Sequence, residues 1–119
     1  MRLLIAEDNE QMRSLIKTIM RSPTNSLFEC ADGESAVVMY DRLHPDCVLM
    51  DVEMKPVDGI TATRLIKALH PEAKIIIVTN YGDKRTRAAA AQAGADGFVE
   101  KEELVTLRAV VDDLTVRHV

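Results

Sequence analysis

The sequence is poor in aromatic residues, with two tyrosines, two phenylalanines and no tryptophan. Hydrophobic residues still make up 47% of the 119 positions, so the core must be packed from aliphatic side chains rather than from stacked rings. This length suits one domain with a substantial core. Because linkers, low-complexity stretches and sustained repeats are also absent, we expect residues 1–119 to form a single domain.

The sequence also lacks an excess of basic residues and long hydrophobic runs. Its 15 Lys and Arg against 19 Asp and Glu give a net charge of -4, which would repel a nucleic-acid backbone unless a local basic patch compensated. No apolar run approaches the roughly 20 residues that span a membrane, and the amino terminus lacks a signal-peptide layout. We therefore expect a cytoplasmic domain that contacts neither nucleic acid nor membrane directly.

Short apolar runs alternate with segments of helical period along the whole chain. The runs occupy residues 3–6, 27–31, 48–50, 75–78 and 98–99, and helices are expected within residues 12–20, 34–43, 58–69, 83–93 and 104–114. Five such β-α units with right-handed crossovers predict a doubly wound α/β fold. At this size we expect the flavodoxin-like parallel order 2-1-3-4-5. Glu29 makes the second run more mixed, which suits an edge strand.

The cysteines and two of the histidines have simple structural interpretations. Cys30 and Cys47 match no metal-ligand spacing, and the predicted strand order separates them beyond disulfide reach, so both are interpreted as small buried hydrophobes. His44 and His70 each precede a proline where a helical stripe gives way to an apolar run. We interpret both histidines as helix terminators rather than as ligands or catalysts.

Polar residues stand at the ends of four of the predicted strands. Glu7 and Asp8 follow the first, Asp51 the third and Thr79 the fourth, while Lys101 lies just beyond the fifth. Because the carboxyl ends of parallel strands share one edge of the sheet, these side chains are expected to converge where the strand order reverses. The combination of acids, a hydroxyl and an ammonium group indicates a site that accepts a phosphoryl group.

Each of these residues also has a purely structural interpretation. Glu7 and Asp8 could favour the start of a helix, Thr79 could cap a loop, and Lys101 could be a solvated surface charge. An acid such as Asp51, at the end of a buried strand, is costly unless a metal or a partner compensates its charge. The joint placement of all five favours a functional site over five independent coincidences.

These polar residues, in this order along the chain, resemble the site of the receiver domain of bacterial two-component response regulators. The resemblance is to chemotaxis regulators in particular and covers essentially the whole chain. Residues 51–59 are similar to the family's loop after the phosphorylated aspartate, and residues 93–98 are similar to the segment that leads to its lysine. The resemblance implies that Asp51 is the nucleophile, that Lys101 neutralises the transferring oxygens and that Thr79 donates its hydroxyl to one of them. Turnover of an outside substrate is not expected.

The charges of the predicted site imply Mg²⁺ as its cofactor. Three carboxylates against Lys101 leave about two negative charges, which would repel a dianionic phosphoryl group. Asp8 and Asp51 could supply oxygen ligands, and by resemblance the backbone carbonyl of Glu53 could supply another, with Glu7 holding a coordinated water.

The resemblance also implies a switch and a set of partners. Charge on Asp51 should draw Thr79 inward, so that Phe98 can rotate and alter the surface formed by the last two helices and the fifth strand. The implied phosphoryl donor is a histidine kinase or phosphotransfer protein. The implied reader is a downstream target or a DNA-binding output domain, with a homodimer possible through the same surface. The simpler alternative is that Phe98 belongs to the core.

Some positions depart from the family pattern. Lys55 separates Met54 from Pro56, and Glu102 follows Lys101 where proline is common, so Lys101 could be held less rigidly. Glu53 and Tyr81 lie two positions beyond Asp51 and Thr79, and the resemblance implies that these positions face the attacking water. We hypothesise that they hinder this water and lengthen the phosphoryl lifetime.

Other functional classes fit less well. A flavodoxin should have a phosphate-cradling first loop, which the acidic residues 7–10 would oppose. A phosphatase with an aspartyl intermediate would place a second aspartate where Glu53 stands. A pseudo-receiver that binds partners without phosphorylation stays open.

Overall fold

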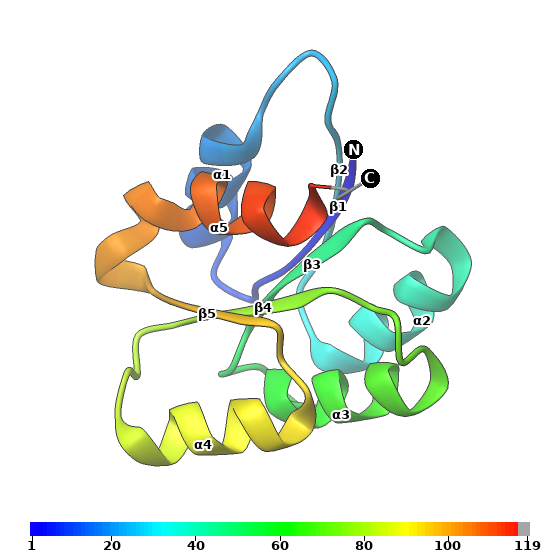
Figure 1. The fold of residues 1–119 in the computed structure, drawn as a ribbon, viewed down its shortest axis with the longest axis vertical. Helices are drawn as coiled ribbons and strands as arrows, with labels where there is room; N and C mark the ends of the chain where they lie inside the picture. Colours follow the sequence, from blue (N-terminus) through cyan, green and yellow to red (C-terminus); the bar gives the residue numbers. More distant parts are fainter. Residues whose placement is uncertain (117–119) are drawn as a thin grey trace.

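A computed structural model describes residues 1–116 of the chain. Five parallel strands form one sheet in the order β2-β1-β3-β4-β5, which confirms the predicted flavodoxin-like topology (Figure 1). The strands are β1 Arg2–Ala6, β2 Ser26–Cys30, β3 Cys47–Asp51, β4 Ile75–Thr79 and β5 Gly97–Glu100. Among the described residues, no helix has the length and hydrophobicity that crossing a membrane requires.

Five α-helices cover the two faces of the sheet. They are α1 Glu10–Met20, α2 Gly33–Leu43, α3 Gly59–Leu69, α4 Lys84–Ala93 and α5 Leu107–Thr115. Helices α1 and α5 lie on one face, and α2, α3 and α4 lie on the other (Figure 1). Each face has its own aliphatic core, and the three central strands are fully buried along almost their whole length. The expectation of an aliphatic core is confirmed.

Side-chain caps fix where the helices begin. Asp32, Asp58 and Asp83 each accept a hydrogen bond from the backbone N–H three residues later, and Asn9 does the same for α1. These bonds satisfy N–H groups that the first helical turn leaves free. Since α1, α3 and α4 follow strands β1, β3 and β4, the caps also hold the loops at the carboxyl edge of the sheet.

The helix ends follow the sequence predictions, and the cysteines follow them in part. His44 and His70 are the residues at which α2 and α3 end, and Gly94 ends α4 in a left-handed conformation with φ of 98°. Cys30 and Cys47 are free thiols on the two strands that flank β1; Cys47 is buried as predicted, whereas Cys30 is only half-buried. Strand β2 is the edge strand expected from Glu29, whose exposed carboxylate pairs with Arg13 and Lys17 of α1.

The last predicted helix is shorter than the apolar stripe suggested. A 3₁₀ segment, η1 (Lys101–Thr106), comes first, so Leu104 lies outside α5 although it is buried as predicted. Glu103 has non-helical dihedral angles, and the Thr106 hydroxyl donates to the Glu103 carbonyl at 2.8 Å. Such local bonds compete with helical ones, and β-branched residues tolerate helices less well. The short segment places Lys101 at the carboxyl edge of the sheet.

Candidate functional site

The predicted site residues meet in one cavity at the carboxyl edge of the sheet. Its volume is about 220 Å³, and its lining includes residues at the carboxyl ends of the neighbouring strands β1 and β3. The lining residues are Glu7, Asp8, Asn9, Asp51, Glu53, Thr79, Asn80, Tyr81 and Lys101. All the predicted catalytic and metal-binding positions are in this set, whereas Phe98 is not.

The cavity concentrates most of the buried polar side chains of the described residues. Glu7 is 1% exposed, Asp51 4% and Thr79 0%, and the Lys101 side chain is 7% exposed. Asp8 is exposed at the cavity mouth. Burying acids at the ends of strands β1 and β3 carries a desolvation cost, which the rest of the fold must offset.

Lys101 bridges the two buried carboxylates. Its Nζ lies 2.7 Å from Glu7 Oε1 and 3.1 Å from Asp51 Oδ1. Among the described residues no group donates a well-oriented hydrogen bond to Glu7 Oε1, so its contact with Lys101 is mainly electrostatic. Glu7 Oε2 accepts the Asn9 N–H at 3.1 Å. The resemblance implied only a water-holding role for Glu7, and this direct ion pair was not predicted.

Burial and crowding change how these groups bind protons. Burial, followed by the nearby charge of Glu7, raises the pKa of Asp51 to about 7, although Lys101 opposes the shift. Burial by itself would lower the pKa of Lys101, but the close carboxylates of Glu7 and Asp51 outweigh it and hold that pKa above its ordinary value. The site therefore contains one permanent cation and a carboxylate that resists ionisation until further positive charge is supplied.

The donor set fits a divalent cation that prefers oxygen ligands. One carboxylate oxygen from each of Glu7, Asp8 and Asp51 lies within 4.8 Å of the other two. All three ligands are hard oxygen donors, which suit Mg²⁺ better than metals that prefer nitrogen or sulfur. The incompletely bonded Glu7 Oε1 and the raised pKa of Asp51 both indicate that the pocket is short of positive charge.

Two residues at the cavity mouth form a pair. A hydrogen bond with Glu53 and the charge of its carboxylate raise the pKa of Tyr81 above that of an ordinary tyrosine. The Tyr81 backbone N–H also donates to Thr79 Oγ1 at 3.1 Å. Glu53 and Tyr81 thus stand together over the buried carboxylate, although they come from loops after different strands.

Phe98 lies away from the cavity, on the face of the sheet covered by α3 and α4. Its ring is half-buried, and the Arg87 guanidinium lies 4.4 Å from the ring centroid. Arg87 also approaches Glu100 Oε2 at 3.4 Å and donates to the Gly82 carbonyl at 3.1 Å. The sequence analysis did not anticipate this link between α4 and β5. The residue types of Arg87 and Phe98 permit such a contact, but they do not show which side of α4 faces β5.

Gly59 is required by the close packing at the end of the segment from residue 51 to residue 59. A Cβ atom at this position would lie 1.8 Å from the Asp51 carbonyl oxygen, so only glycine permits the observed approach of α3 to β3. Its N–H donates to the Val52 carbonyl at 2.9 Å. The sequence analysis included Gly59 only as part of the segment, because a packing distance cannot be read from residue types alone.

Known proteins resemble the chain in sequence and in fold. A family model for the response regulator receiver domain matches residues 3–112. The chemotaxis protein CheY of Halobacterium salinarum is 36% identical over 115 residues, which are 95% of this chain and 96% of that protein.

Solved structures give the same result. The receiver domain of the sensor histidine kinase PA1611 from Pseudomonas aeruginosa, described with a magnesium ion coordinated in its active-site cleft, is 28% identical. It has a TM-score of 0.87, and the match covers 96% of each chain. A two-component response regulator of the LuxR family from Aurantimonas is 29% identical with a TM-score of 0.82, over 94% of this chain and 85% of that one. The chain therefore belongs to the response regulator receiver domains of two-component signalling.

Proposed function

We propose that this receiver domain accepts a phosphoryl group on Asp51 from a histidine kinase or a phosphotransfer protein. The observation that carries the proposal is the buried Asp51 carboxylate, 3.1 Å from the Lys101 ammonium and crowded by Glu7. An Asp51 oxygen attacks phosphorus and forms the acyl phosphate, while the bond between phosphorus and the donor nitrogen breaks and the departing imidazole keeps that electron pair. The chain modifies itself and turns over no outside substrate.

The side chains around Asp51 have separate tasks in this transfer. Lys101 remains protonated, because two carboxylates raise its pKa, and neutralises a transferring oxygen. The buried Thr79 hydroxyl donates to another oxygen. The carboxylates of Glu7, Asp8 and Asp51, with the Glu53 carbonyl, would hold Mg²⁺, which supplies positive charge where the phosphoryl oxygens gather.

The output surface we propose consists of α4, β5 and α5. Thr79 and Phe98 lie on the adjacent strands β4 and β5, and the Arg87 guanidinium on the Phe98 ring joins β5 to α4. A new bond from the Thr79 hydroxyl to the phosphoryl group would move β4 relative to β5 and weaken this contact. A target protein, a DNA-binding output domain or a second copy of the chain would read the altered surface.

Beryllofluoride, which mimics a phosphoryl group on a carboxylate, tests the proposal in solution. In the presence of Mg²⁺ it should shift the backbone amide signals of Asp51, Thr79 and Lys101, and then those of α4 and β5. Asp51→Asn should show no such shifts, and omission of Mg²⁺ should abolish them. Unchanged wild-type spectra would support a pseudo-receiver instead, although the grouping of all the reactive side chains in one cavity favours the active form.

Removal of the Tyr81 ring is expected to shorten the phosphoryl lifetime. The ring and the Glu53 carboxylate stand over the cavity mouth and hinder an attacking water. Tyr81→Ala should speed phosphate release by about 3- to 10-fold, equivalent to roughly 1 kcal/mol in the barrier. Phosphate release after removal of the donor measures this rate.

Tyr81→Phe is the matched control for this effect. It keeps the ring but loses the hydroxyl contact with Glu53, so its rate should lie between those of the wild type and Tyr81→Ala. Equal rates for Tyr81→Ala and the wild type would show that the ring does not shield the acyl phosphate.

A further inference from the structure

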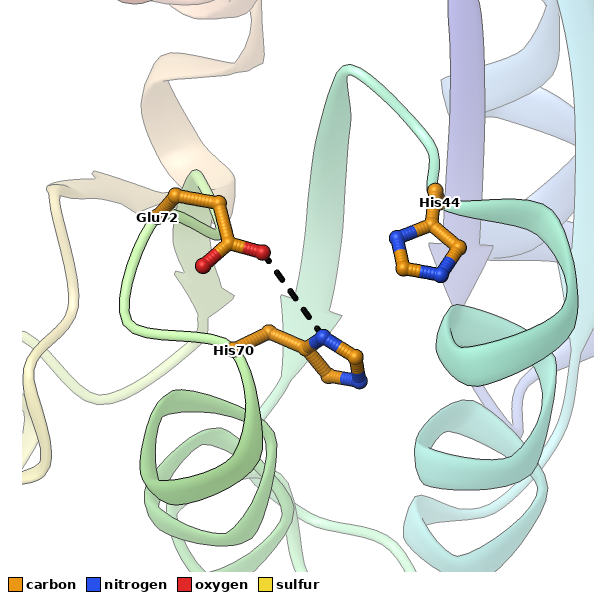
Figure 2. A group of neighbouring side chains, drawn as sticks. All are labelled: His44, His70 and Glu72. Carbon is orange, nitrogen blue, oxygen red and sulfur yellow. Dashed lines mark ion pairs between the residues drawn. The ribbon is translucent and has the colours of Figure 1, made fainter.

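A second group of metal-ligating side chains lies at the opposite edge of the sheet from the phosphoacceptor cavity. His44 follows the end of α2, His70 follows the end of α3, and Glu72 lies two residues further on. Figure 2 shows the two imidazole rings on opposite sides of the gap between these chain segments, with the Glu72 carboxylate beside His70. One ligand atom from each of the three residues lies within 4.8 Å of the other two.

Both ring nitrogens of His70 face a carboxylate oxygen. Nε2 is 3.3 Å from Asp41 Oδ1, and Nδ1 is 3.6 Å from Glu72 Oε1. A neutral imidazole carries one N–H, so it can donate to only one of these carboxylates. Its other nitrogen lone pair then faces a carboxylate oxygen, which is unfavourable unless a second ring proton or a metal cation lies between them.

We propose that His44, His70 and Glu72 form a binding site for a divalent transition metal of the zinc class. Two ligands about 2.0–2.1 Å from a tetrahedral zinc lie roughly 3.3 Å apart, close to the 3.6 Å between His70 Nδ1 and Glu72 Oε1. Imidazole with carboxylate is a donor set that suits zinc rather than magnesium. Asp41 would hold the second nitrogen of His70, as outer carboxylates do for metal-bound histidines.

The packing around the two rings supports a defined geometry. Buried Tyr40 backs both, with its ring centroid 5.0 Å from that of His70 and 5.8 Å from that of His44, and the two imidazoles meet nearly at right angles, 5.1 Å apart. His44 adopts a left-handed backbone conformation with φ of 44°, in which glycine or asparagine is more favourable. Terminating a helix alone does not call for histidine at this position.

A metal at this site would join the ends of α2 and α3 without touching the phosphoacceptor cavity. Both helices pack on the same face of the sheet, and each leads into a central strand, α2 into β3 and α3 into β4. Metal binding should therefore raise the thermal midpoint of the folded domain, because the ligand binds the native state preferentially. Phosphoryl transfer to Asp51 should proceed with or without it.

The test is calorimetric titration of Zn²⁺ into the full chain, with excess Mg²⁺ present to occupy the acidic cavity. The wild type should bind one Zn²⁺ per chain, and the imidazole signals of His44 and His70 should shift together in NMR spectra. His44→Asn, which tolerates the left-handed backbone, and Glu72→Gln should each weaken binding by about tenfold or more. Asp41→Asn should weaken it by roughly tenfold.

Two further variants separate this site from other sources of Zn²⁺ binding. His118→Asn removes the remaining histidine of the sequence, and Asp8→Asn disrupts the acidic cavity; neither should change the affinity. The proposal is overturned if the wild type binds no Zn²⁺ under these conditions. It is also overturned if His44→Asn and Glu72→Gln bind as well as the wild type, or if Asp8→Asn abolishes binding.

Discussion

Replacing Lys101 by methionine is expected to destabilise the folded protein by about 3 kcal/mol in Mg²⁺-free buffer. The ammonium lies within 3.1 Å of two buried carboxylates, and its removal leaves both without their nearest positive charge. Methionine keeps a similar length and apolar volume, so the loss reports charge rather than packing. Urea unfolding at neutral pH measures the change in free energy.

A double-mutant cycle separates the ion pair from other effects of the substitution. In a Glu7→Gln background one of the two buried charges is already removed, so Lys101→Met should cost clearly less there. Mg²⁺ should restore part of the lost stability, because it supplies positive charge to the same carboxylates. A loss below about 1 kcal/mol in the wild-type background, typical of an exposed ion pair, would contradict a buried bridge.

The second large effect is a stabilisation produced by Asp51→Asn. Burial and Glu7 raise the pKa of Asp51 to about 7 in the folded state, against roughly 4 in the unfolded chain. Between these values the native state holds a proton that the unfolded state has lost, so stability falls as the pH rises through about 7. In Mg²⁺-free buffer above that pH, Asp51→Asn should be more stable than the wild type by on the order of 2 to 4 kcal/mol.

The pH dependence of the stability difference between Asp51→Asn and the wild type identifies the cause of that difference. Near pH 4 the aspartate is protonated in the folded protein, so the free energies of unfolding of the two proteins should differ by no more than about 1 kcal/mol. Asp113→Asn, an exposed acid on α5, is the matched control and should change stability little at either pH. If Asp51→Asn were more stable than the wild type by the same amount at both pH values, ionisation of Asp51 would not be what destabilises the wild type. Saturating Mg²⁺ should reduce the advantage.

The sheet and the location of the cavity could be predicted from the sequence because both depend on strong local patterns. Continuous apolar runs such as residues 75–78 are typical of strands buried on both faces. In a parallel sheet, the residues that follow the carboxyl ends of the strands all lie at the same edge. Glu7, Asp51, Thr79 and Lys101 therefore meet in the structure although up to 94 positions separate them in the sequence.

The contacts between separate elements could not be predicted in the same way. The Arg87 guanidinium on Phe98 depends on how α4 rotates over β5, and the meeting of His44 with His70 depends on how α2 packs beside α3. Residue types and hydrophobic periodicity do not show how a helix is rotated or how it packs against its neighbour. The boundary at Thr106 was also missed, because the apolar stripe continues through the 3₁₀ segment while the backbone bonding changes.

The central claim is that Asp51 forms an acyl phosphate, and intact-mass spectrometry tests it most directly. After incubation with Mg²⁺ and acetyl phosphate, the wild type should gain the mass of one phosphoryl group, and peptide mapping should assign that group to Asp51. Asp51→Asn should gain nothing under the same conditions. A wild type whose mass never changes, or an Asp51→Asn protein that is labelled equally, would contradict the account.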